Sequence, residues 1–141
     1  MKELLERIAV SKGWHFEYGR DDLLNLDVNV LNPDNFYLYV DATEEEVVFD
    51  EFSKVRYRTY NGRFMLLRHS ELDRVYDAQM GGVSAEGKYE RYIKPCKEGV
   101  MCIADWFCSD YTIRRWVITE VINHYSNNFD GVIVSYSVVK E

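Results

Sequence analysis

Three cysteines and three histidines are the residues of this chain that are best suited to metal binding or nucleophilic catalysis. Cys96, Cys102 and Cys108 follow a C-x5-C-x5-C spacing. Structural zinc sites use closer pairs and a fourth ligand, so this spacing does not predict one. A Cys–His nucleophile pair needs no fixed spacing, but no flanking motif supports one here. We expect three buried or half-buried thiols, with no disulfide framework because their number is odd.

A second candidate pair is Glu120 and His124, which would share one face of a helix predicted over 110–126. Such a pair suits metal binding or acid–base chemistry, but no motif supplies a third ligand, and an ordinary surface contact is the alternative. The run Asp27–Asn29 begins like a calcium loop, yet Leu31 occupies the next ligand position. Nucleotide-binding, zinc-protease and nucleophile-elbow motifs are absent from the sequence. We therefore expect no catalytic residues, no cofactor and no metal.

Charge segregation is the more informative pattern. Residues 41–51 hold six acidic residues, and residues 54–68 hold five basic ones. The two segments either neutralise each other across neighbouring strands or bind complementary surfaces on a partner. Arg56, Tyr57 and Arg58 alternate as in a nucleic-acid-binding ribbon, but the nearby glutamates argue against nucleic acid. The candidate partner contacts are Glu44, Glu45, Glu46, Arg56, Tyr57, Arg58, Tyr60 and Arg63.

Composition indicates one globular domain spanning residues 1–141. The chain is 47% apolar and 15% aromatic, which is enough to form a core. Its net charge of −7 disfavours nonspecific binding to nucleic acid or anionic membranes. The first eight residues are amphipathic and charged, and no apolar run is long enough to span a membrane. We expect a soluble cytoplasmic protein with no membrane association.

The N-terminal half is predicted to form a helix and two hairpins. A helix over 2–12 should end at Gly13. Strands at 26–30 and 36–40, joined by a turn at 32–35, should form the first hairpin. In the second hairpin, strands at 47–49 and 55–60 lead to Asn61-Gly62. That dipeptide predicts a type I′ turn, from which a strand over 63–68 returns.

The C-terminal half is predicted to be mainly helical until its last strand. We expect a brief helical turn near 70–73 and a mobile glycine-rich surface loop near 81–90. Residues 97–107 favour a helix that Gly99 weakens. The helix over 110–126 should cover the sheet, and a strand over 132–139 should close the fold, with Val132, Val134, Tyr136 and Val138 on one face. The expected class is α+β: N-terminal helix, antiparallel hairpin-rich sheet, covering helix and final strand.

This order of elements resembles that of tailed-phage tail-terminator and tail-completion proteins. Residues 56–64 and 116–123, leading through 129–131 into 132–138, carry the resemblance. It implies a structural protein that forms a ring at the head-proximal end of a phage tail, with a virion location and no catalytic residues. The charged segments would suit the heterologous contacts of a ring.

We therefore expect a non-enzymatic assembly protein that acts through homo-oligomer or protein-partner contacts. A small-ligand or peptide-binding module, with an apolar pocket between helix and sheet, is the first alternative. An enzyme with an unrecognised site around His124, Glu120 or a cysteine is the second.

Overall fold

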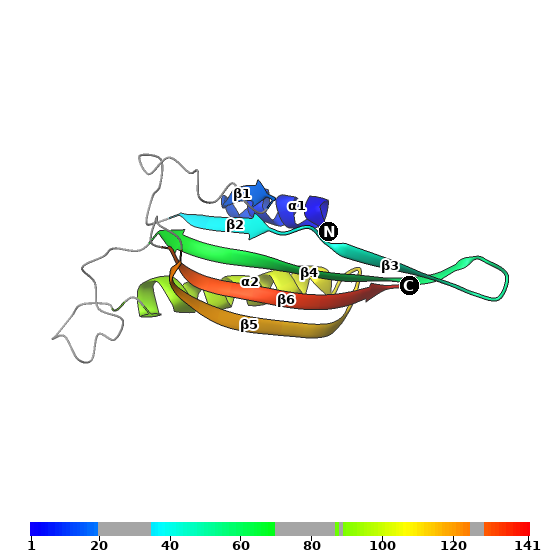
Figure 1. Ribbon diagram of the computed structural model, residues 1–141. Coiled ribbons are helices and arrows are strands. Elements are labelled where there is room, and N and C mark those ends of the chain that lie inside the picture. The colour runs from blue at the N-terminus through cyan, green and yellow to red at the C-terminus, as the bar shows by residue number, and fades with distance from the viewer. Residues whose placement is uncertain (20–34, 70–86, 88, 125–128) are drawn as a thin grey trace.

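A computed structural model describes residues 1–19, 35–69, 87, 89–124 and 129–141 (Figure 1). The elements in chain order are α1 (Lys2–Lys12), β1 (His15–Tyr18), β2 (Phe36–Val40), β3 (Glu44–Phe49), β4 (Val55–His69), the π-helical turn η4 (Tyr89–Ile93), α2 (Lys94–Phe107), β5 (Thr112–His124) and β6 (Phe129–Lys140). A leading helix, a largely antiparallel sheet, a second helix and a final strand confirm the predicted α+β class. Within the described part of the chain, no helix is both long and apolar enough to cross a membrane.

The sheet has six strands and is organised around β4. Its order is β1-β2-β4-β6-β5, and β3 pairs with β4 beyond the end of β2. One edge of β4 therefore binds two short strands in succession: β2 along residues 64–68 and β3 along residues 55–61. The other edge pairs with β6 along residues 58–69. All neighbouring strands are antiparallel except β1 and β2, which are parallel.

Both helices lie on one face of the sheet (Figure 1). Helix α1 buries Leu4, Leu5, Ile8 and Ala9, and it ends at Gly13, whose φ of 72° is the left-handed conformation expected of a C-terminal glycine. Helix α2 buries its own apolar stripe against the strands. These helical side chains and the sheet residues beneath them form the main core. The sheet residues that α1 and α2 cover include Leu38, Val40, Phe64, Leu66, Val132, Val134, Tyr136 and Val138.

A smaller aromatic cluster lies on the opposite face of the sheet. It contains Tyr37, Tyr39, Met65, Leu67 and Phe129, all of them buried. Phe129 packs edge-on against Tyr37 and Tyr39, with ring centroids 5.5 and 6.1 Å apart. Part of the unusual tyrosine content of the chain is thus used in a second core layer.

The prediction of a helix over 110–126 was wrong. Residues 112–124 form the edge strand β5, and the helix that covers the sheet is α2. A run rich in Thr, Ile and Val favours extended backbone once it has a strand to pair with. Glu120 and His124 consequently do not share a helical face, and Glu120 instead forms an ion pair with Lys97 on α2.

The predicted turn at Asn61-Gly62 was also wrong, because β4 continues through both residues. The connection between β3 and β4 lies earlier, at Asp50–Lys54. There, Asp50 Oδ1 accepts hydrogen bonds from the backbone N–H groups of Phe52 and Lys54 at 2.8 and 3.0 Å. This side-chain acceptor holds the turn in place of an Asn-Gly dipeptide.

The other predicted elements divide into two groups. The helix over 2–12, the strands over 36–40 and 132–139 and the helix over 97–107 are confirmed, the last with an earlier start. The strand over 26–30, the turn at 32–35 and the helical turn near 70–73 lie outside the described residues. So does most of the predicted loop over 81–90, although its last two residues begin η4.

Candidate interaction surface

A β-hairpin projects from the body of the protein (Figure 1). We call residues 47–57 the hairpin arm, because here β4 pairs only with β3. Pairing between β4 and β6 begins at Arg58, opposite Lys140. The arm thus has two strands, whereas the rest of β4 lies inside a wider sheet. Such a ribbon gains little stability from its own strand pairing and has both faces open to solvent.

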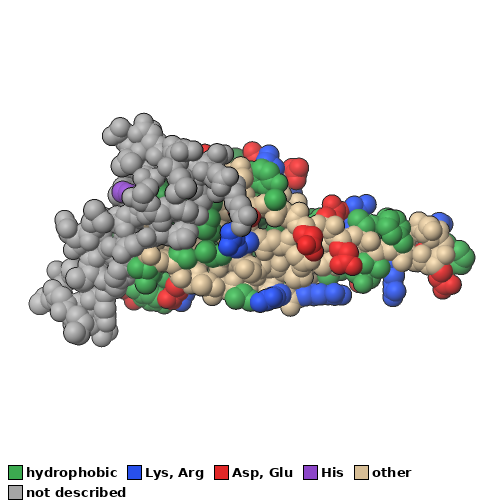
Figure 2. All heavy atoms as spheres, viewed as in Figure 1, with side chains coloured by type: hydrophobic (Ala, Val, Ile, Leu, Met, Phe, Trp, Pro, Cys, Tyr) green, Lys and Arg blue, Asp and Glu red, His purple; other side chains and the backbone are tan. Residues whose placement is uncertain are grey.

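Three apolar side chains are exposed on the arm. Phe49, Phe52 and Val55, which we call the arm tip, are 58%, 79% and 48% exposed. Figure 2 shows hydrophobic side chains at the far end of the arm, with charged side chains beside them. Single exposed apolar residues are common on protein surfaces, but a group of them on one projecting element is typical of a contact site.

The turn that presents the arm tip is well determined by its hydrogen bonds. Besides the two amides bound by the Asp50 side chain, the Asp50 N–H donates to the Lys54 carbonyl at 2.8 Å. The Ser53 N–H donates to the Asp50 carbonyl at 3.1 Å, and Ser53 has a φ of 62°. These bonds hold Phe52 at the outermost position without support from the protein core.

At the base of the arm, acidic and basic side chains pair across β3 and β4. Arg58 donates to Glu45 at 2.6 Å, and Glu44 accepts a long bond of 3.5 Å from Asn61. The hydrogen bond from Arg58 lowers the pKa of Glu45, and the same contact raises the pKa of Arg58. Burial, together with the neighbouring Glu45 carboxylate, raises the pKa of Tyr60. Part of the charge segregation is therefore neutralised between neighbouring strands.

The remaining predicted contact residues lie apart from the ion pair between Arg58 and Glu45. Arg63 donates to Asp41 at 2.7 Å, in the gap between β2 and β3. Glu46 is exposed opposite Thr59 and has no ion-pair partner among the described residues. Arg68, counted with the basic segment, belongs to the body of the protein, where it donates to the Arg91 carbonyl at 2.8 Å.

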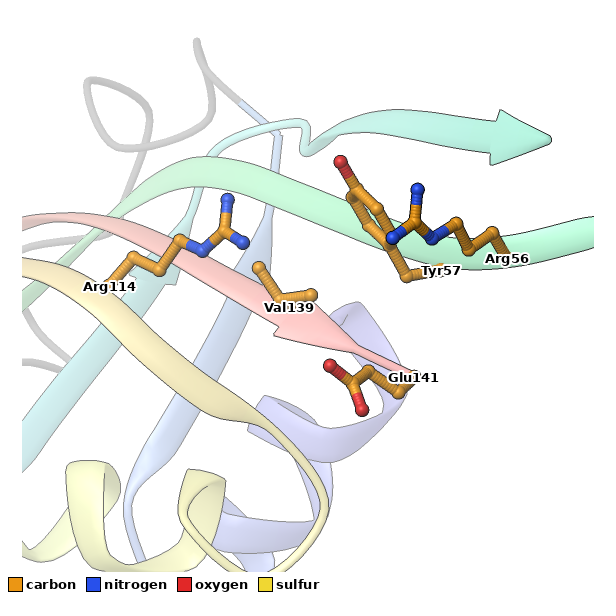
Figure 3. A pocket seen from close by; sticks show the side chains of 5 residues that line it. All are labelled: Arg56, Tyr57, Arg114, Val139 and Glu141. Atoms are coloured by element: carbon orange, nitrogen blue, oxygen red, sulfur yellow. The ribbon is translucent and has the colours of Figure 1, made fainter. Parts of the chain in front are cut away.

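A polar hollow of about 510 Å³ lies where the arm joins the sheet (Figure 3). Its lining is Arg56, Tyr57, Arg114, Val139 and Glu141. Within the part of the chain that the structure describes, Arg56 and Arg114 form no ion pair. Ligand pockets are mostly apolar with a few polar groups, and this hollow has the reverse character. It suits the acidic side chains of a protein surface better than a small apolar ligand.

The residues considered for catalysis are not gathered in one place. Cys96 is buried on the core side of α2, whereas Cys102 and Cys108 are exposed, so the expectation of three buried or half-buried thiols was wrong for two of them. Cys102 faces outward from α2 and Cys108 follows its last residue. No group of three His, Cys, Asp or Glu side chains within the described ranges could hold a metal ion.

The arm tip was missed at the sequence level because the turn was assigned to the wrong dipeptide. The segment Phe49–Ser53 carried a signal, since Asp50 is a good turn former and two phenylalanines flank it. The sequence matches no known protein-family model and no curated protein.

Proposed function

We propose that this chain is a non-enzymatic assembly protein that binds other protein subunits through the hairpin arm and the charged surface at its base. The single observation that supports this most is the arm tip, where Phe52 is 79% exposed at the end of an ordered turn. Apolar side chains at such a position contribute nothing to the core of a lone subunit. They contribute binding energy when a partner covers them.

The surroundings of the arm tip are consistent with a protein partner. Interfaces combine an apolar centre with a polar rim, and aromatic and arginine side chains are enriched in them. Here Glu46, Arg56 and Tyr57 lie close to the exposed apolar group along the same ribbon. The finer form of the proposal is a tail-completion or terminator-like component of a phage or prophage, located in the virion. It rests on the architectural resemblance alone.

The assembly state can be measured by size-exclusion chromatography with multi-angle light scattering over a range of protein concentrations. We expect a mass above that of one 16.7 kDa chain, which falls toward it on dilution. The double variant Phe49→Ser/Phe52→Ser should stay monomeric. The matched control is Val10→Ser on α1, which removes a side chain that is 76% exposed but lies outside the arm.

Two results would count against the proposal. One is a wild-type chain that stays monomeric at millimolar concentration. The other is an oligomer that the arm variant and the Val10 control leave equally intact, which would place the contact elsewhere.

A further inference from the structure

Strands β3 and β5 each have an open outer edge, on opposite sides of the sheet (Figure 1). Strand β3 pairs only with β4, and β5 pairs only with β6, so no strand of the described chain covers either outer edge. An open edge carries backbone N–H and C=O groups that can bind a further strand. Charged side chains and bulges protect such edges from indiscriminate pairing, and β5 has both. A strand that binds β5 must therefore complement its charges.

The open edge of β3 is acidic. Residues 44–46 are all glutamate, and the strand holds no basic residue. Glu45 is neutralised by Arg58 of β4. Glu44 and Glu46, by contrast, form no ion pair with another described residue. The edge therefore presents two carboxylates that have no ionic partner within the described part of the chain.

The first part of the β5 edge is basic. Arg114 and Arg115 are exposed and form no ion pair with another residue that the structure describes. Glu120, the one carboxylate of this strand, is already paired with Lys97 of α2. The segments that flank the start of β5 add one basic and two acidic residues, so this end of the edge stays net basic. They are Lys140, Asp110 and Glu141.

The charges of the two edges lie at the same level of the sheet and on the same face. Glu44 pairs with Asn61 of β4, which pairs with Ser137 of β6. Ser137 in turn pairs with Arg115 of β5. Residues that are directly opposite on neighbouring strands point to the same face. This row points away from the helices, because Ser137 follows the core residue Tyr136 along its strand.

The second carboxylate of β3 has a basic counterpart as well. Glu46 is two residues further along β3 and on the same face, and its row leads through Thr59 to Val139. Val139 lines the polar hollow together with Arg114, which occupies the first bulge of β5 (Figure 3). On a strand added to β5, a carboxylate at the level of Glu46 would therefore lie at this hollow.

The strand directions allow these two edges to pair between copies. Strands β3, β4, β6 and β5 are successive antiparallel neighbours, so β3 and β5 run in opposite directions. A second copy that stands beside the first in the same orientation thus presents its β3 antiparallel to β5. Within one chain the two edges cannot meet, because β4 and β6 lie between them.

We propose that β3 of one copy adds to the β5 edge of a second copy as an antiparallel strand, with Glu44 opposite Arg115 and Glu46 at the hollow beside Arg114. This inference rests on the proposed assembly function and specifies the surface that the charged base of the arm meets. Because two different edges meet, the contact is heterologous. Its repetition builds a closed ring if the rotation between neighbours allows closure, and a filament otherwise.

Exchange of the two charges tests this inference. Glu44→Arg puts arginine on both sides of the contact, and Arg115→Glu puts glutamate on both sides. Each variant alone should self-associate about tenfold more weakly than the wild type or worse, because like charges then oppose each other. A 1:1 mixture should recover the wild-type assembly, since each contact again joins opposite charges. Light scattering gives the mass, and native mass spectrometry should find the two variants in equal numbers within each assembly.

Matched controls reverse exposed charges outside both strands. Lys12→Glu on α1 and Glu98→Arg on α2 should each assemble like the wild type, alone and when mixed. Circular dichroism checks that every variant is folded. If an edge variant is not folded, Glu46→Arg and Arg114→Glu provide the equivalent exchange at the neighbouring position.

The possible outcomes separate this inference from the assembly function on which it rests. A wild-type oligomer that both edge variants leave intact would overturn the pairing of β3 with β5 and leave the assembly function in place. A mixture that stays as dissociated as its two components would do the same. A wild-type chain that is monomeric at millimolar concentration would overturn both.

Discussion

Gly62 offers a sharp test of the strand arrangement, because the sequence suggests a turn where the structure has continuous strand. Gly62 pairs with Tyr136 on β6, and a Cβ added to it would lie 2.5 Å from the Tyr136 hydroxyl oxygen and 2.8 Å from ring atom Cζ. Gly62 is absent from the residues with positive φ, which among the described glycines are Gly13 and Gly19. Gly62→Ala should therefore destabilise the protein through a collision with the tyrosine and not through backbone strain.

The magnitude follows from two opposing effects. Overpacking a filled site costs about 1–3 kcal/mol. Replacing glycine by alanine where the backbone is extended and allows a side chain stabilises the fold by about 0.4–1 kcal/mol, because the unfolded chain has less conformational entropy. We expect Gly62→Ala to lower the free energy of unfolding by about 1–2 kcal/mol. Tyr136→Phe alone should cost about 1 kcal/mol, since the hydroxyl forms a hydrogen bond of 3.1 Å with Thr43.

Urea denaturation of the two single variants and the double variant completes the test. The double variant should lose about 0.5–1 kcal/mol less stability than the sum of the two single losses, because the Tyr136 hydroxyl oxygen, the atom closest to the added Cβ, is absent from it. The matched control is Gly13→Ala, where φ is 72° and no atom lies within 4 Å of the added Cβ. Its cost should add to that of Tyr136→Phe without coupling. A neutral Gly62→Ala, or simple additivity at that site, would refute the assigned register.

Two further changes address the arm and the buried thiol. Asp50→Ala should accelerate the hydrogen exchange of the Phe52 and Lys54 amides, measured by NMR, because both amides donate to the Asp50 side chain. Asp50→Asn keeps an acceptor oxygen and should leave both exchange rates unchanged. Equal exchange rates in the two variants would contradict the turn assignment. Burial raises the pKa of the Cys96 thiol, because the buried site disfavours the thiolate. The buried, protonated thiol therefore stabilises the fold fully below the ordinary thiol pKa of about 8.5, and the free energy of unfolding falls as pH rises above that value. Iodoacetamide at pH 8 should label the two exposed cysteines and reach Cys96 only on unfolding, as read by mass spectrometry.

The fold class could be predicted from the sequence because several elements have unambiguous local patterns. The helix over 2–12 combines an apolar stripe with a terminal glycine. The strand over 132–139 alternates strictly between Val132 and Val138. Both patterns involve only residues that are close along the chain, so they can be recognised without knowledge of the tertiary structure.

Strand β5 was misread because two irregularities disturb its alternation. The pairing of β5 with β6 shifts between Ile113 and Arg115 and again between Val121 and His124. Ile113, Trp116 and Ile118 all pack toward the main core, so the inward positions are spaced by three and then by two residues. A β-bulge thus produces a spacing that resembles one side of a helix.

Gly62, which misled the turn prediction, and Gly99, which only weakened a correct helix prediction, both have tertiary reasons that no local pattern contains. Gly62 leaves room for the ring of Tyr136, and Gly99 lets α2 approach the sheet. A Cβ at Gly99 would lie 2.6 Å from a methyl carbon of Leu66. Glycine at these positions allows close contact between elements and is not used for a turn or a helix end.

The charge pattern left two alternatives open, neutralisation across neighbouring strands or contact with a partner, and the structure shows the first for Glu45 with Arg58 and for Asp41 with Arg63. Glu45 and Arg58 pair with each other within the chain, whereas Glu46, Glu51, Lys54 and Arg56 form no ion pair with another described residue. Exposed charges contribute mainly to the rate of encounter and to partner choice, whereas buried aromatic side chains contribute most of the affinity. In the proposed interface, we expect the charged base of the arm to select the partner surface. We expect the arm tip, which is seen only once the turn is located at residues 50–54, to determine how long the two proposed surfaces stay together.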